Sequence, residues 1–160
     1  MSTVKAKSEL VQQGAKIVVP YPGSDMQAVD VLALAEVYYH NSQTLLPSST
    51  KPKSSPPFRL LIIHAIELYL NAFLLTCGKR AEEIRGLQHD LAKRESLAQQ
   101  SGLQLKKKTA AHLRTLSANR EYLVSRYGSC GGNNVSQPNR LQATLEEVRK
   151  KVTLKVKPTS

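Results

Sequence analysis

The chain has 160 residues, with 23 Lys or Arg against 12 Asp or Glu, and a formal net charge of +11. This length suffices for one domain whose core needs neither disulfides nor a structural metal. The two cysteines, Cys77 and Cys130, form no Cys-x-x-Cys pair and have no His at ligand spacing, which excludes the common zinc motifs. Phosphate-binding Gly-rich loops, Gly-x-Ser-x-Gly and His-Glu-x-x-His are also absent, so we expect no metal and no cofactor.

The two ends of the chain are polar. Residues 1–20 contain only a short β-branched patch that ends in turn formers, which predicts a flexible N-terminal arm. The arm lacks an apolar stretch followed by small residues, as a secretory signal would have, so a cytoplasmic location is expected. A single helical domain is predicted for residues 21–155, followed by a tail of residues 156–160.

The first predicted helix follows Asp25, which is a suitable N-cap residue. Val29, Leu32 and Val37 then recur at helical spacing. The next segment, residues 47–57, is rich in Pro, Ser and Lys and is predicted to be a mobile loop.

The second helix is the most apolar part of the chain, yet it carries a strip of polar side chains. In FRLLIIHAIELYLNAFLLTCG, the residues His64, Glu67 and Asn71 lie within about 60° of one another on a helix. The stretch is long enough to span a membrane, but a central carboxylate costs about 2.5 to 3.5 kcal/mol on insertion scales. We therefore expect a buried helix of a soluble bundle and no membrane partner.

Three more helices are predicted after the second. Asp90 is a suitable N-cap for the third helix, and the fourth runs from about Lys106 to Gly128, with Arg120 on its apolar stripe. A second mobile loop is expected over 128–138. The fifth helix follows it, and the whole pattern predicts an all-α, up-and-down bundle of about five helices. Its apolar face is formed by Leu141, Leu145, Val148 and Val152.

The segments HAIELYLNAFLLTCG, GLQHDLAKRESLAQQSGL and LSANREYLVSRYG, taken in this order, resemble the HEPN helical-domain superfamily over about Phe58 to Gly128. The most specific parts are the His-Ala-x-Glu-Leu helix that begins at His64 and the His89-Asp90-Leu91 helix opening. Family members usually have Lys where this chain has Asn71 and Gly where it has Gln88.

The resemblance implies a helical bundle that often forms a homodimer. It also implies a role in RNA cleavage, toxin–antitoxin pairs or defence, with a minimal nucleotidyltransferase as a frequent antitoxin partner. Catalytic members carry Arg-x(4–6)-His late in the domain and cleave RNA without a metal. In this chain only Arg59 and His64 match that spacing, early in the domain, with Leu60 where active members have a polar residue.

For each remaining candidate there is a structural interpretation beside the functional one. Glu67, with His64 and Asn71, is expected either to fix helix packing through a hydrogen bond to a neighbouring helix or to face a partner. His89 and Asp90 are expected to cap a helix. Two basic clusters are candidates for nucleic-acid binding or are simply a solvated basic face, namely Lys106, Lys107 and Lys108, and Arg149, Lys150 and Lys151.

The function that best fits these patterns is a HEPN-like binding domain without nuclease activity, acting as a homodimer with RNA or a nucleotidyltransferase. Two alternatives stay open. One is a metal-independent endoribonuclease that uses Arg59 and His64. The other is a helical protein–protein adaptor with no nucleic-acid role.

Overall fold

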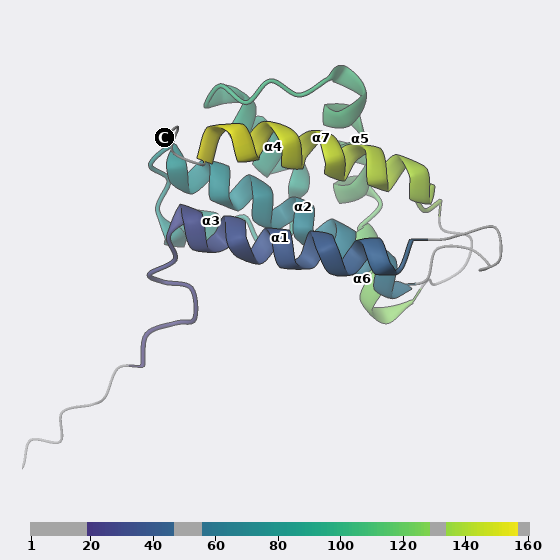
Figure 1. Ribbon diagram of the computed structural model, residues 1–160, viewed down its shortest axis with the longest axis horizontal. Coiled ribbons are helices and arrows are strands. Elements are labelled where there is room, and N and C mark those ends of the chain that lie inside the picture. Colours follow the sequence, from purple (N-terminus) through teal and green to yellow (C-terminus); the bar gives the residue numbers. More distant parts are fainter. Residues whose placement is uncertain (1–18, 47–55, 129–133, 157–160) are drawn as a thin grey trace, which may run out of the picture.

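The computed structural model describes residues 19–46, 56–128 and 134–156. Within these residues the chain forms seven α-helices and no strand (Figure 1), which confirms the all-α prediction. Most of the predicted arm, the tail and the core of both predicted loops lie outside the described residues. The helices are α1 (Ala28–Thr44), α2 (Pro56–Thr76), α3 (Ala81–Gly86), α4 (Leu91–Gln100), α5 (Lys107–Ala118), α6 (Glu121–Tyr127) and α7 (Pro138–Val156).

Helix α2 is the centre of the bundle. It packs against α1, α7, α6, α4 and α3. Figure 1 shows α7, α2 and α1 as three long, roughly parallel rods, with the shorter α4 and α5 behind them. Since α1 contacts only α2 and α7 among the described helices, α1 and the α4–α5 pair cover different sides of the bundle.

The central position of α2 explains its composition. Pro56 and Pro57 occupy its first turn, where a missing backbone N–H leaves no helical hydrogen bond unmade. The helix ends before Gly78, whose φ of 84° is a left-handed conformation that glycine adopts without strain. By length and composition α2 is the one described helix that could cross a membrane, but 78% of its most apolar stretch is buried inside the bundle. Buried core helices of soluble proteins have a similar length and composition.

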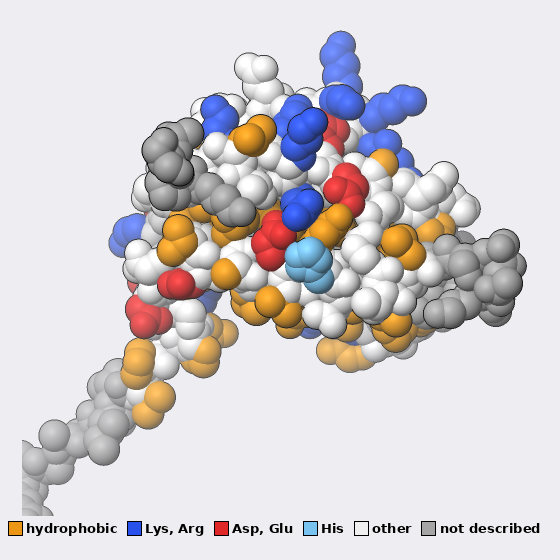
Figure 2. Space-filling view, in the orientation of Figure 1, with side chains coloured by type: hydrophobic (Ala, Val, Ile, Leu, Met, Phe, Trp, Pro, Cys, Tyr) orange, Lys and Arg blue, Asp and Glu red, His pale blue; other side chains and the backbone are white. Residues whose placement is uncertain are grey.

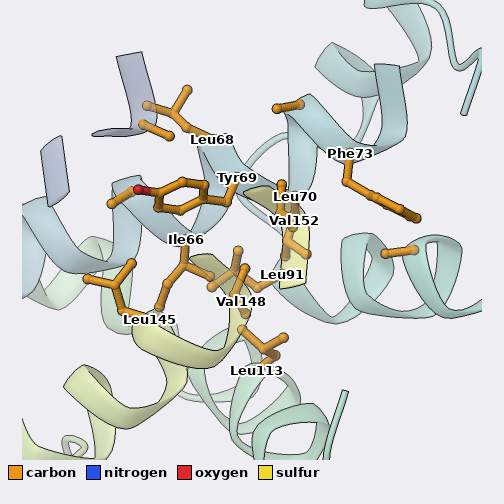
Figure 3. Packing of buried hydrophobic residues seen from close by; sticks show 14 of the residues in the cluster. Ile66, Leu68, Tyr69, Leu70, Phe73, Leu91, Leu113, Leu145, Val148 and Val152 are labelled. Atoms are coloured by element: carbon orange, nitrogen blue, oxygen red, sulfur yellow. The ribbon is translucent and has the colours of Figure 1, made fainter. Parts of the chain in front are cut away.

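The core is a single cluster formed by α2 and its neighbours. Figure 3 shows Ile66 and Tyr69 of α2 packed near Leu145 and Val148 of α7. The predicted apolar face of α7 is confirmed, since Leu141, Leu145, Val148 and Val152 are all fully buried. Burial of such side chains contributes roughly 1.5 to 3 kcal/mol each, so α7 is an integral part of the fold.

The structure corrects three local predictions. Helix α1 starts at Ala28 with Gln27 as its N-cap, and no side chain caps it, so Asp25 is not the cap. The charged connection after Gly78 contains the short helix α3, which the sequence analysis missed. The predicted fourth helix is two helices, because Arg120 has a φ of 49° and breaks the run between α5 and α6. Arg120 is exposed and does not join the apolar stripe.

Candidate functional site

Glu67 and Asn71, two of the three residues of the polar strip of α2, join Arg94 and the partly exposed His89 in a group of side chains that we call the Glu67 cluster. Glu67 Oε2 lies 3.1 Å from His89 Nδ1, and Glu67 Oε1 lies 3.5 Å from Arg94 Nη2. Asn71 Oδ1 accepts a 2.7 Å hydrogen bond from Arg94 Nε. The structure thus gives Glu67 partners on and beside a neighbouring helix, α4, as its structural interpretation requires.

Arg94 is the most buried charge of the Glu67 cluster, with 2% of the residue exposed. Burial lowers the pKa of its guanidinium, and the charges of Glu67 and Asp90 oppose that shift. The backbone carbonyls of Asp90 and Ile84 accept further hydrogen bonds from Arg94 at 3.4 Å. A buried guanidinium with carboxylate, amide and carbonyl acceptors is well compensated, so the cluster fixes α4 against α2.

His64 lies one turn before Glu67 and faces a different partner. Its ring makes an edge-on contact with Tyr38 of α1, with ring centroids 4.5 Å apart. Burial lowers the pKa of His64 and keeps the imidazole neutral near pH 7. His64 lines a cavity of about 570 Å³ beside the Glu67 cluster, and Tyr21, whose ring lies under the Arg85 guanidinium, lines it too.

Arg59 is held apart from His64. Its Nη1 lies 3.5 Å from Glu121 Oε2 of α6, and both residues are buried. Burial lowers the pKa of Arg59, while the Glu121 charge raises it. The Arg-x4-His spacing therefore does not bring the two side chains to a shared site, since one pairs with α6 and the other contacts α1.

Glu121 also opens a hydrogen-bonded series that the sequence analysis missed. Glu121 Oε1 accepts from the backbone N–H of Ser136 at 3.0 Å and from its hydroxyl at 2.6 Å. His112 Nε2 lies 2.8 Å from Ser136 Oγ, and His112 Nδ1 lies 2.7 Å from Thr144 Oγ1. Burial, and secondarily the charge of Arg140, lower the pKa of His112 to about 4. A neutral imidazole therefore links α5 to α7.

Asp90 caps α4, as predicted. Its Oδ1 accepts a 3.0 Å hydrogen bond from the Lys93 backbone N–H and a 3.2 Å hydrogen bond from the Ser117 hydroxyl. Burial would raise the pKa of Asp90, but these hydrogen bonds and the Lys93 charge leave it lowered. The adjacent His89 contacts Glu67 instead of capping the helix, so the two residues of the motif have different roles.

The two basic clusters meet at one groove of about 890 Å³ between the start of α5 and the outer side of α7. We call it the basic groove. Figure 2 shows Lys and Arg side chains gathered over this edge of the molecule. Lys107, also predicted from the sequence, does not line the groove. The cationic residues that line the basic groove are Lys106, Lys108, Arg140, Arg149, Lys150 and Lys151.

The acidic residues of the basic groove are already engaged. Glu147 accepts hydrogen bonds from the Lys106 backbone N–H at 2.7 Å and the Thr109 hydroxyl at 2.5 Å, and its Oε1 lies 3.0 Å from Lys151 Nζ. Burial alone would raise the pKa of Glu147, but these partners leave it lowered and the carboxylate ionised. Glu146 accepts a 2.8 Å hydrogen bond from the Tyr39 hydroxyl.

Arg149 is the least available cation of the basic groove. Its Nε and Nη2 donate to the carboxylate of Glu36 at 3.0 and 2.9 Å, and its guanidinium lies 4.0 Å from the Tyr39 ring centre. The hydrogen bonds to Glu36 are the main reason why its pKa is raised. Arg149 therefore ties α7 to α1. Lys151 is paired with Glu147 and also donates to the Gln104 carbonyl, so the lining cations without an acidic partner among the described residues are Lys106, Lys108, Arg140 and Lys150.

Two buried polar atoms in the wall of the basic groove have no hydrogen-bond partner in the described structure. They are Arg140 Nη2 and Thr153 Oγ1. Because buried polar groups nearly always have partners, unsatisfied donors beside a groove indicate a place for a ligand or for water. Sequence patterns pointed to Lys108 and Lys150, but Arg140 and Thr153 stood in no cluster.

Among the described residues no group of three His, Cys, Asp or Glu side chains could hold a metal ion. In comparisons with protein-family models, with curated proteins and with solved structures, the chain has no match.

Proposed function

We propose that this protein is a HEPN-like helical domain that binds RNA through the basic groove and has no nuclease activity. The observation that supports this best is the convergence on one groove of four cations that have no acidic partner in the described structure. Lys106 and Lys108 come from the N-cap and first turn of α5, whereas Arg140 and Lys150 come from α7. Lys and Arg side chains along a groove attract a phosphate backbone and release its counterions.

The composition of the groove favours backbone contacts over reading of bases. The described lining contains no aromatic side chain, whereas base stacking uses Phe, Tyr, Trp or His. We therefore expect affinity that depends strongly on salt and weakly on sequence.

Two observations support the HEPN part of the proposal. The Glu67 position that carries the resemblance is the centre of a buried cluster between α2 and α4. In addition, Gln88 stands where family members usually have Gly, and its φ is 50°, a conformation that glycine adopts most easily. A homodimer and a nucleotidyltransferase partner are part of this proposal.

The test measures RNA binding by fluorescence anisotropy over a series of salt concentrations. Lys108→Glu with Lys150→Glu removes two groove cations. Lys107→Glu with Lys79→Glu makes the same change of net charge outside the groove lining. If Lys108 and Lys150 both contact phosphates, the plot of the logarithm of the RNA association constant against the logarithm of the salt concentration should become shallower by roughly 1.4. Each single-strand phosphate contact contributes about 0.7 to this slope.

The control pair should leave the slope close to that of the wild type. Equal effects of both pairs would contradict binding at the groove. Absence of RNA binding by the wild type would favour the protein–protein adaptor. RNA cleavage that persists with chelator and is lost in Arg59→Ala or His64→Ala would favour the endoribonuclease.

A further inference from the structure

Two turns in the described structure contain the only non-glycine residues with positive φ. These are Gln88 at 50°, between α3 and α4, and Arg120 at 49°, between α5 and α6. A side chain on Cβ makes this left-handed conformation unfavourable, and glycine is the residue that usually relieves it. Residues held in such conformations concentrate at functional sites.

Both strained residues line the same cavity, although they are far apart in the chain. This cavity, which we call the turn pocket, has a volume of about 340 Å³ and lies on the α3–α4 and α5–α6 turns. Helices α4 and α5 pack on each other and thereby bring the two turns together. Its lining residues include Gln88, His89, Asp90, Lys93, Ser117, Arg120 and Tyr122.

The turn pocket has one cation, Arg120, that no acid of the described structure neutralises. Arg120 makes no side-chain hydrogen bond or ion pair with the described residues. Lys93 Nζ pairs with Asp90 Oδ2 at 3.6 Å, and the other oxygen of Asp90 accepts hydrogen bonds from the Lys93 backbone N–H and from Ser117. Asp90 is the only carboxylate in the lining, against the two cations Lys93 and Arg120, so the pocket keeps an excess of positive charge.

The turn pocket also has an oriented imidazole. Glu67 engages His89 Nδ1 from inside the bundle, which leaves Nε2 as the free polar atom of the ring. The His89 ring packs on Tyr122, with centroids 4.8 Å apart, so its orientation is fixed from two sides. Nε2 accepts a hydrogen bond from a protonated oxyanion when the ring is neutral and donates one when the ring is charged.

We propose that the turn pocket binds a phosphate group, with Arg120 and Lys93 as charged donors and His89 Nε2 as an oriented partner. Guanidinium and ammonium groups are the usual recognition elements for phosphate. The strain fits this role, because a glycine at position 120 would relax the backbone but remove the cation. The site is separate from the basic groove, so its existence does not depend on the proposed RNA binding.

The experiment titrates the full-length chain with inorganic phosphate and follows amide and imidazole NMR shifts. A dissociation constant of about 1 mM or tighter is expected for a small anion at such a site, with the largest shifts at residues 88–93 and 117–122. A dinucleotide with a 5′-phosphate and the same dinucleotide with a 5′-hydroxyl show whether the natural source is free phosphate or a phosphorylated end. No saturable shift with any of these probes would overturn the proposal.

Arg120→Gly is the informative variant because glycine suits the backbone conformation, so the fold is kept while the guanidinium is lost. We expect phosphate affinity to fall about tenfold or more, as for the loss of one charge-assisted hydrogen bond. Lys79→Gly is the matched control, since it removes a cation outside the lining of the turn pocket, and it should bind as the wild type does. Unchanged binding by Arg120→Gly would refute the assignment.

Lys108→Glu with Lys150→Glu separates the two proposals. This variant should keep phosphate binding at the turn pocket even if it loses RNA binding at the basic groove. Loss of phosphate binding in this variant, with retention in Arg120→Gly, would place the phosphate in the basic groove and contradict the turn pocket.

Discussion

At the scale of single residues, buried charge is the main feature of this protein. Glu67 has its side chain 10% exposed and Arg94 2%. Removing one partner of such a pair leaves the other charged and buried, which costs more than the pair contributes as a whole. The same reasoning applies to Arg59 and Glu121.

Glu67→Ala should therefore lower the free energy of unfolding by about 1 to 3 kcal/mol, because Arg94 and His89 lose their shared acceptor. Chemical denaturation measures this. Glu82→Ala, at an exposed position of α3, is the control and should change stability little. If both variants unfold at the same denaturant concentration, the Glu67 cluster does not hold α4 on α2.

His112 gives the protein a pH-dependent stability. Its pKa in the folded chain is about 4, against 6.5 for an ordinary histidine, so the unfolded chain binds the extra proton first as the pH falls. Stability is then fully present above about pH 6.5 and decreases towards pH 4, by roughly 2 to 3 kcal/mol for this group. Urea unfolding at a series of pH values measures the change.

The control for this prediction is His112→Gln, which keeps a polar side chain but does not titrate. The decrease between pH 6.5 and 4 should be smaller in this variant than in the wild type. Identical pH profiles would mean that other groups, such as the lowered carboxyls of Asp90 and Glu147, account for the acid sensitivity.

The sequence indicated one half of each polar site. Glu67 was conspicuous because it interrupts an apolar helix, whereas its partner Arg94 lies in the ordinary charged run LAKRESL. Lysine runs indicated the basic groove, but the contribution of Arg140 depends on how α5 meets α7. Pairing between distant segments follows from tertiary packing, which periodicity does not encode.

At the scale of elements, the long helices were predictable and the short ones were not. α2 and α7 have many apolar residues at helical spacing. α3 has six residues, of which only Ala81 and Ile84 are buried, so it has too few for a periodic pattern. The break between α5 and α6 has no Gly or Pro signal, because Arg120 adopts the left-handed conformation that such a turn requires.

Gln88→Gly should stabilise the turn between α3 and α4. Relief of the left-handed conformation gains about 1 to 2 kcal/mol, and the greater freedom of glycine in the unfolded chain offsets about 0.5 to 1 kcal/mol of it. A rise in the thermal midpoint is expected. The comparison is Gln88→Ala, which retains Cβ and should gain nothing, and equal midpoints for the two variants would argue against strain at this position.

At the scale of the whole molecule, the positive charge is unevenly distributed. α1 contains no Lys or Arg, although the chain has 23 of them. The same helix exposes Val29, Leu34 and Val37, with 55%, 46% and 55% of each residue accessible. In a chain with a net charge of +11, two copies would approach with least repulsion through this surface.

The proposed homodimer should therefore depend on α1. Val37→Lys places a charge in the apolar face and should shift the protein to monomer in light scattering after gel filtration, with the helical content unchanged. Thr115→Lys, at an exposed position of α5, adds the same charge elsewhere and should leave the dimer intact. A dimer that survives Val37→Lys would place the subunit contact on another face.

The packing of α7 against α2 has a consequence for how the chain folds during synthesis. α7 supplies Leu141, Leu145, Val148 and Val152 to the core, and α2 lies far earlier in the sequence. Until α7 has left the ribosome, α2 presents an uncovered apolar flank in the presence of other nascent chains. The newly made protein is therefore most open to chaperone capture and to misassembly in the interval before its last described helix emerges.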